Sequence, residues 1–202
     1  LSNLSDEGLT ILPSHRLVKQ AEGFEVTPFL KTVSQWFNIK TFHAECRNLT
    51  GECSHMKSEL QQAGKKTTAI AFRLHESDQW YLFTLKPGMR DQMGDDLHPS
   101  LRDLDVLVLS RFILQKSLGF TREDLDDEEI FHYESTFETA VTSVNAGEYE
   151  MAFLLNPTRM AHVKAVAGNS LVMPRKSTYF HPKVLSGLVF NKIDPHEQIQ
   201  VP

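Results

Sequence analysis

The segment TAIAFRLHESDQWYLFTL, residues 68–85, carries the strongest structural signal in the chain. Ile70 and Phe72 alternate with small or polar residues, which is the period of two expected for a β-strand. A polar turn at residues 75–78 then leads into a second apolar run that begins at Trp80. Two such runs joined by a short polar turn predict a β-hairpin.

Further strands and helices are predicted on both sides of this hairpin. Short apolar runs bounded by turn residues predict strands at 9–18, with an interruption at Pro13, and at 39–42, 130–134 and 151–155. Residues typical of helix N-termini precede apolar residues at helical spacing. Helices are therefore expected to start at Thr27-Pro28, at Ser54, at Asp105, at a capping box formed by Ser135 and Glu138, and at Asn156-Pro157.

These elements alternate without the regular rhythm of a parallel α/β fold. We therefore expect an α+β protein with a mixed, mostly antiparallel sheet and helices packed on it. The length of 202 residues fits one large domain, so residues 1–202 are predicted to form a single domain. Because the chain starts at Leu1 and an apolar segment follows closely, we interpret it as the C-terminal part of a longer protein.

The composition excludes some classes of protein. The net charge is −5 and no basic stripe is present, which argues against a nucleic-acid partner. No run approaches the ~20 apolar residues of a membrane helix, so a membrane partner is not expected either. The two cysteines, Cys46 and Cys53, cannot form a disulfide framework in a chain of this length. Reduced thiols favour a cytoplasmic location.

The first candidate site is the segment MPRKSTYFHPK, residues 173–183. It combines cations with hydroxyl groups, and two prolines restrict its backbone. Such a loop can hold a phosphate or carboxylate through charge-assisted hydrogen bonds. The side chains suited to this task are Arg175, Lys176, Ser177, Thr178 and Lys183. The alternative is a surface loop with solvated cations and aromatic residues in the core.

Two other segments could contribute to the same site. His15 titrates near neutral pH in its ordinary state, and the adjacent Arg16 can grip an anion with its planar guanidinium. Asn156 and Thr158 lie between a buried strand and an expected helix, where free amides attract anions. A structural role for the first pair and ordinary helix capping for the second are the alternatives. The three segments form one anion-binding site only if the fold brings them together.

Other kinds of site have weaker support. Glycine-rich phosphate loops and the Gly-x-Ser-x-Gly motif are absent from the sequence. His43, Cys46, Cys53 and His55 are the nearest approach to a zinc-ligand cluster, but their spacing matches no common zinc site. The carboxylates of Asp95, Asp96, Asp103 and Asp105 could bind magnesium, although a solvated loop explains them better.

Three segments of the chain resemble one family of prokaryotic proteins, domain-of-unknown-function family 1015. These segments are ILPSHR at 11–16, FLLNPT at 153–158 and MPRKSTYFHPK at 173–183, and residues 104–119 are similar to an apolar helix of that family. Ser14 and His181 stand where the family often has threonine and tyrosine. The resemblance spans nearly the whole chain.

The resemblance also implies a function. Full-length members carry an upstream Asp-Gly-His-His-Arg motif that is similar to one in ParB-like free-serine kinases. This chain has no such motif, so the resemblance implies that the partner completing the site is a missing N-terminal part. A nucleotide with magnesium would then be the cofactor.

Two hypotheses follow from the sequence. In the first, the chain contributes an anion- or phosphate-binding surface to a small-molecule phosphotransferase and is inactive alone. Arg16, Lys176 and Lys183 would then neutralise phosphate charge, while His15, Ser177 and Thr178 would position the ligand. In the second, the chain is a non-catalytic structural, regulatory or dimerisation domain, with a homodimer as the assembly. Burial or internal pairing of the lysines favours the second hypothesis.

Overall fold

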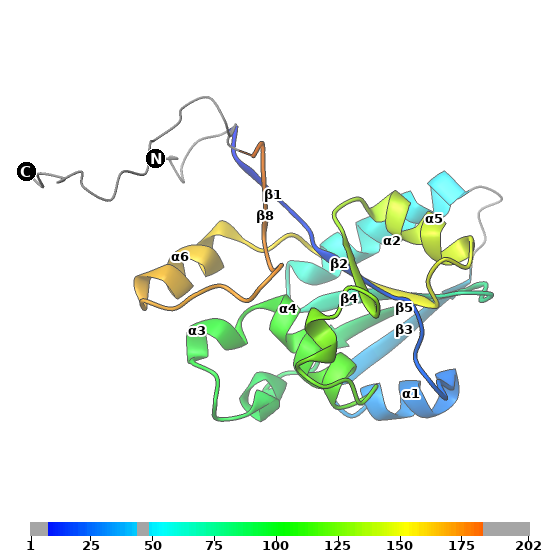
Figure 1. The fold of residues 1–202 in the computed structure, drawn as a ribbon, viewed down its shortest axis with the longest axis horizontal. Helices are drawn as coiled ribbons and strands as arrows, with labels where there is room; N and C mark the ends of the chain where they lie inside the picture. The colour runs from blue at the N-terminus through cyan, green and yellow to red at the C-terminus, as the bar shows by residue number, and fades with distance from the viewer. Residues whose placement is uncertain (1–7, 44–48, 184–202) are drawn as a thin grey trace, which may run out of the picture.

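A six-stranded sheet organises the protein, as seen in a computed structural model that describes residues 8–43 and 49–183 (Figure 1). The strand order is β3-β5-β4-β7-β2-β6, and each neighbouring pair is antiparallel. The strands are β2 (His15–Val18), β3 (Phe37–His43), β4 (Ala69–Leu74), β5 (Gln79–Leu85), β6 (Phe131–Glu134) and β7 (Met151–Leu155). The predicted α+β class with a mostly antiparallel sheet is confirmed.

The predicted hairpin is confirmed as β4 and β5, which lie near the middle of the sheet. Ile70 faces Phe83 across the pair, and Phe72 faces Tyr81. On its other side β4 pairs with β7, whose five residues are all buried. A strand covered on both faces has no solvent side, which explains why β7 is an uninterrupted apolar run.

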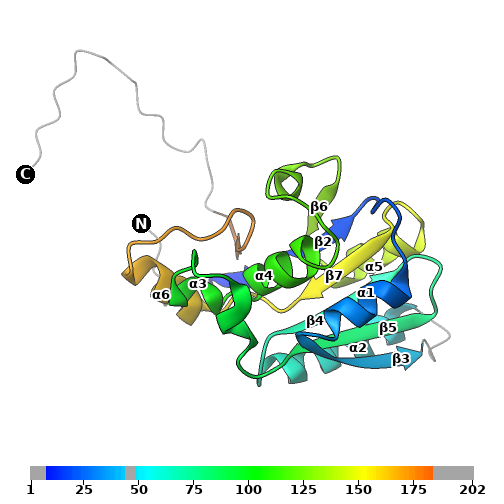
Figure 2. The same cartoon turned by 90° about the horizontal axis from the view of Figure 1, so that it is seen from below.

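Helices cover both faces of this sheet (Figure 2). Alternate strand residues face opposite sides, so Phe72 and Phe83 pack in one core and Ala71 and Leu82 in the other. The first core also contains α1 (Val26–Val33), α4 (Asp105–Val108) and the helix that continues α4. The second contains α2 (Leu49–Gly64) and α5 (Phe137–Asn145). The result is a sheet between two helical layers.

A small arm projects from one end of this core (Figure 1). It is a two-stranded antiparallel sheet of β1 (Thr10–Leu12) and β8 (Tyr179–His181). Near the same end lie α3 (Pro99–Arg102) and α6 (Met160–Gly168), which are tied by a bond from Asn169 Nδ2 to Ser100 Oγ at 3.0 Å. The pairing of β1 with β8 brings residues 173–183 next to the start of β2.

The apolar helix predicted from Asp105 is present, but its second half has more residues per turn than an α-helix. At Leu109 α4 gives way to a π-helix, η2 (Leu109–Gln115). The amide of Lys116 bonds to the carbonyl of Arg111, a spacing of five residues, at 3.2 Å. Rare π-turns often occur at functional sites, so this element is a place to look for one.

Two predicted helix starts are wrong because the helices begin earlier than their polar signals. α1 begins at Val26, so Thr27 lies inside it and Glu25 precedes it. α2 already includes Leu49, which places Ser54 within the helix. None of the helices in the described ranges has the length and hydropathy needed to cross a bilayer.

Two further capping predictions are wrong because the groups concerned make other contacts, one local and one tertiary. Ser135 precedes the N-cap of α5, Thr136, and the Glu134 carboxylate accepts bonds from both amides at 2.7 and 2.8 Å. α6 begins only at Met160, and Asn156 instead donates its side-chain amide to the carbonyl of Leu60 at 3.1 Å. The argument that Asn156 lies at a helix N-terminus therefore fails.

The described residues also contain the short 3₁₀ turns η1 (Met89–Met93) and η3 (Asp124–Asp126).

Candidate anion-binding site

His15 and Arg16 lie side by side on β2, but their side chains point to opposite faces of the sheet. The His15 ring packs edge-on against Phe137 of α5, with 5.7 Å between ring centroids. Arg16 lies opposite Tyr133 of β6 and turns toward the face that carries η2. The two residues therefore do not share one binding surface.

His15 is a neutral side chain in the folded protein. Only 1 % of the residue is exposed, and burial lowers the pKa of its imidazole to about 3, with smaller contributions from Arg16 and Lys57. Its Nδ1 accepts a hydrogen bond from the amide of Leu155 at 3.1 Å. Its Nε2 is buried without a hydrogen-bond partner among the described residues. The ring thus joins β2 to the end of β7.

Arg16 is a buried cation held by neutral groups. Its Nη1 donates to the backbone carbonyl of Ser14 and, at 2.8 Å, to the hydroxyl of the same residue. Its Nη2 donates to the backbone carbonyl of Lys176 at 3.2 Å. The guanidinium carbon lies 4.4 Å from the centre of the Tyr133 ring. Burial lowers the Arg16 pKa to about 10, so the group keeps its charge at neutral pH. Within residues 8–43 and 49–183, no carboxylate forms an ion pair with it.

The bond from Arg16 to Lys176 joins two segments that are 160 residues apart. A third segment joins them through Thr158, whose hydroxyl donates to the carbonyl of Ser177 at 2.8 Å. Lys176 adopts a positive φ of 53°, which is uncommon for a residue with a side chain. The Ser177 hydroxyl is buried and lacks a partner in the described part of the chain. The fold therefore brings together all three segments that the sequence singled out.

The cations of this loop are partly paired with carboxylates. Lys176 forms an ion pair with Glu128 at 2.7 Å, and Arg175 forms one with Asp126 at 3.1 Å. Lys183 lies on the arm, with its amine 4.6 Å from the centre of the Tyr179 ring. Among the described residues, no hydrogen bond or ion pair joins Lys183 to Arg16 or Lys176. An anion-binding role for these residues, and for Asn156 and Thr158, remains a prediction.

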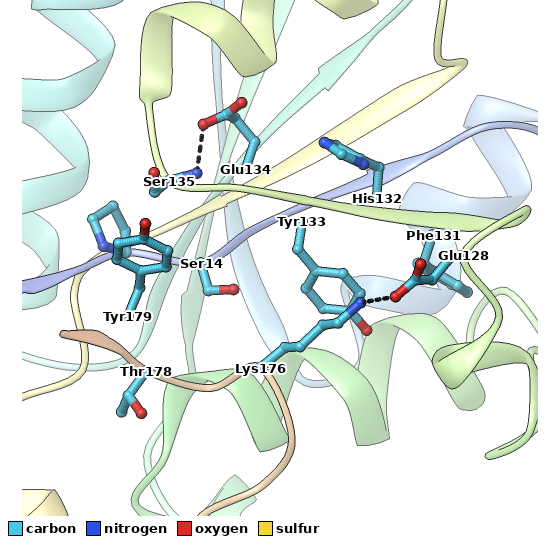
Figure 3. A pocket seen from close by; sticks show the side chains of 11 residues that line it. Ser14, Glu128, Phe131, His132, Tyr133, Glu134, Ser135, Lys176, Thr178 and Tyr179 are labelled. Atoms are coloured by element: carbon cyan, nitrogen blue, oxygen red, sulfur yellow. Dashed lines mark hydrogen bonds and ion pairs between the residues drawn. The ribbon is translucent and has the colours of Figure 1, made fainter. Parts of the chain in front are cut away.

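One cavity of about 370 Å³ lies beside the edge strand β6 (Figure 3). Lys176 extends across the Tyr133 ring, with its amine 4.3 Å from the ring centre and bonded to Glu128. The rest of the lining is mostly polar and adds the Glu134 carboxylate to the charges of Lys176 and Glu128: Ser14, His132, Glu134, Ser135, Thr178 and Tyr179, with Pro13 and Phe131. This mixture indicates no single ligand charge.

A second cavity, of about 320 Å³, is rich in arginine. It lies between the sheet, η2 and the loop at Pro174, and it shares Tyr133 with the first cavity. Four of its lining residues are arginines and one is a carboxylate: Arg16, Arg111, Arg122, Arg175 and Asp126. Ser110 and Gln115 add polar groups, and apolar residues of α4, η2 and η3 complete the wall. This cavity is the candidate site for an anion.

Sequence analysis found Arg16 and Arg175 but missed Arg111 and Arg122. The signal at Arg111 was the polar pair Ser110-Arg111 inside the most apolar helix of the chain. That pair lies on the face of η2 turned toward the cavity. Arg122 had no comparable signal, because it lies in an ordinary charged loop.

The residues considered for metal binding do not form a ligand cluster in the described ranges. Asp96 pairs with Arg111 and Arg122, and Asp103 pairs with Arg90 at 2.7 Å. The Asp105 carboxylate accepts the Thr68 hydroxyl at 2.6 Å. Cys53 is buried, and Cys46 lies outside the described residues.

Comparison with known proteins places these observations in a family. A model of the family described as "Protein of unknown function (DUF1015)" matches residues 1–107, more than half of the 202 residues. A search of curated proteins finds no match. The solved structure of a conserved hypothetical protein from Pyrococcus furiosus is similar over 89% of this chain, at 14% identity and a TM-score of 0.45. This chain spans 59% of the length of that structure.

Proposed function

The chain belongs to the DUF1015 family of proteins of unknown function, and we propose that it binds a small molecule carrying a phosphate or carboxylate group in the arginine-lined cavity. The proposal concerns binding by the residues of this cavity. Catalysis is a separate and finer proposal, taken up below.

The observation that carries the proposal is the state of Arg16. A buried charge costs several kcal/mol unless it is paired, so buried cations in proteins normally have an anionic partner. Arg16 is 5 % exposed, yet its partners are two carbonyls, a hydroxyl and an aromatic ring. These neutral groups offset only part of the cost. An anion entering the cavity would supply the missing charge.

The charges around the cavity favour the same conclusion. Four arginines line it with one carboxylate, and that carboxylate, Asp126, belongs to an exposed pair with Arg175. Exposed ion pairs contribute only about 0–1 kcal/mol, so they give way easily to a better-placed anion. Guanidinium groups also match the geometry of carboxylates and phosphates through paired hydrogen bonds.

A phosphotransferase role is the finer proposal. Arginines that hold a phosphate also stabilise the charge that develops during phosphoryl transfer. The one carboxylate lining the cavity, Asp126, is bonded to Arg175 and is poorly placed as a general base. We propose that an N-terminal part of a longer protein supplies the general base and binds a nucleotide with magnesium. On this proposal the present chain binds the ligand but does not turn it over.

A structural role is the second candidate, and a specific observation favours it. Lys176 and Arg175 are paired with Glu128 and Asp126, as a clasp between the loop and the segment before β6 would require. If the clasp is the whole function, Arg16 only secures this loop. The cavity would then have no affinity for anions.

Titration with orthophosphate by isothermal calorimetry distinguishes these candidates. We expect the wild-type chain to bind, and Arg16→Met and Arg175→Met each to weaken binding by about tenfold or more. That estimate reflects the 1.5–3 kcal/mol of a typical hydrogen bond to a charged group. Arg175 is 59% exposed in its side chain, so its variant should remain folded.

Lys40→Met is the matched control, because it removes an exposed cation from β3, which lies at the opposite edge of the sheet from β6. The control should bind phosphate within twofold of the wild type. Absence of phosphate binding by the wild type, or equal affinities for the Arg175→Met and Lys40→Met variants, would refute the proposal.

A further inference from the structure

We propose that the cavity takes a ligand with two anionic groups, and that the Asp96 carboxylate occupies the second anion position until the ligand displaces it. This inference rests on the proposed function and adds to it the class of ligand and an internal competitor.

The first step is the way Asp96 is held. A single oxygen, Oδ2, accepts a hydrogen bond from Nη2 of Arg111 and another, at 2.8 Å, from Nη2 of Arg122. Both arginines line the cavity. The bond from Arg111 is the main cause that lowers the Asp96 pKa, so this carboxylate is ionised at neutral pH. One oxygen between two guanidinium groups is the arrangement expected for a bound anion.

The Asp96 carboxylate is supplied by a loop separate from the two arginines. Asp96 lies in the loop between η1 and α3, on neither of the elements that carry the two arginines. Gly94 begins this loop with φ 112° and ψ 153°, a conformation that is essentially restricted to glycine. Arg102 holds the loop through the carbonyls of Gly94 and Leu97 at 3.1 and 3.0 Å. A short tethered loop therefore presents a carboxylate to a pair of arginines on another element.

The third step is that this carboxylate can be displaced. The Asp96 side chain is 48% exposed, the Arg122 side chain 67% exposed and the Arg111 side chain 17% exposed. The pair with Arg122 contributes little to stability because water solvates both of its partners well. A phosphate offers more oxygens and more charge than a carboxylate, and it would compete well for the same pair of arginines.

The fourth step is that the cavity has room for two anionic groups. Arg16 and Arg175 line the cavity from the sheet and from the loop at Pro174, and Arg16 is bonded to the backbone of the residue after Arg175. Arg111 and Arg122 form a separate pair, on and just after η2. A volume of about 320 Å³ corresponds to roughly ten water molecules at ~30 Å³ each. That volume exceeds what a single phosphate group needs.

The test compares two variants of neighbouring residues, Asp96→Asn and Asp95→Asn. Both remove one negative charge from the same loop, but Asp95 is fully exposed and its one ion pair within the described residues is with Arg102, at 3.9 Å. Calorimetric titrations with orthophosphate and with pyrophosphate give the ratio of the two affinities for each protein. We expect Asp96→Asn to raise this ratio in favour of pyrophosphate by five- to tenfold, while Asp95→Asn stays within twofold of the wild type.

An equal ratio in the two variants would overturn this inference and leave the proposed function intact, provided that orthophosphate still binds in an Arg175-dependent manner. If none of the proteins bound either anion, both proposals would fail together.

Discussion

Burial has opposite consequences for two adjacent side chains of β2. His15 can lose its proton, so it enters the core as a neutral ring that accepts a bond from Leu155. Arg16 keeps its proton at neutral pH even with its pKa lowered to about 10, and it must satisfy a charge in place. His15 therefore has a structural role, whereas Arg16 carries a buried charge that a bound anion would neutralise.

The low pKa of His15 makes folding depend on pH. The ordinary pKa of 6.5 applies to the unfolded chain, and the folded value is about 3. Between these values the unfolded chain binds a proton that the folded chain does not, so stability is fully present above pH 6.5 and falls as the pH drops towards 3. We expect a loss of about 2 kcal/mol between pH 7 and pH 5 from this residue.

His15→Asn tests this expectation, since asparagine retains an acceptor for the Leu155 amide but does not titrate. Urea unfolding at pH 7 and pH 5 should show a drop in the free energy of unfolding that is about 2 kcal/mol smaller in the variant than in the wild type. Parallel curves for the two proteins would mean that His15 is not buried as described.

At the residue scale, some of the candidate binding residues are recognisable in the sequence and others are not. Arg175 was recognisable because cations, hydroxyls and prolines gather around it within one segment. Arg111 was not, because its contribution depends on which side of a π-helix faces the sheet. Periodicity read at 3.6 residues per turn does not specify that side where the helix has more residues per turn.

At the scale of elements, strands were easier to predict than helix boundaries. The β4–β5 hairpin and β7 follow from local alternation and from an apolar run, which burial within the sheet reinforces. The start of α6 could not be read from Asn156, because its amide bonds to Leu60 of a distant helix. The side chain of such a residue hydrogen-bonds to whichever group the tertiary structure brings near it, and the local sequence does not show which group that is.

One of the contacts that hold the 173–183 segment against the core can be removed without changing charge. The Thr158 hydroxyl donates to the carbonyl of Ser177 next to Lys176. Thr158→Val should lower stability by about 1 kcal/mol, the typical worth of one hydrogen bond, and speed hydrogen exchange at residues 174–179. Thr158→Ser keeps the hydroxyl and should behave as the wild type. Equal exchange in both variants would show that the bond does not restrain the loop.

At the scale of the whole molecule, the antiparallel sheet places the site at one end of the protein. β2 and β6 form one edge of the sheet, and β1, which directly precedes β2, pairs with β8 in the arm and so brings the 173–183 segment back to that edge. η2 covers the adjacent face and completes the cavity. Residues from five separate stretches of the chain therefore line one cavity, which no single motif could have indicated.

The stability of this arrangement depends on the aromatic cluster at the centre of the sheet. Phe72 is fully buried and packs against Phe153 with 5.0 Å between ring centroids and against Phe29 with 5.3 Å. Phe72→Ala should cost about 3–5 kcal/mol in the free energy of unfolding, measured in urea. Tyr179→Ala on the exposed arm should cost less than about 1 kcal/mol. Similar losses in the two variants would contradict the assignment of the core.

Crystals soaked in tungstate, a heavy analogue of phosphate, provide the most direct test of the claim that the arginine-lined cavity binds an anion. Anomalous diffraction locates tungsten without reference to any assumed ligand. We predict a strong peak within hydrogen-bonding reach of the Arg16 and Arg175 guanidinium groups, lost in Arg175→Met crystals. An empty cavity, with tungsten only on exposed surface cations, would contradict the account.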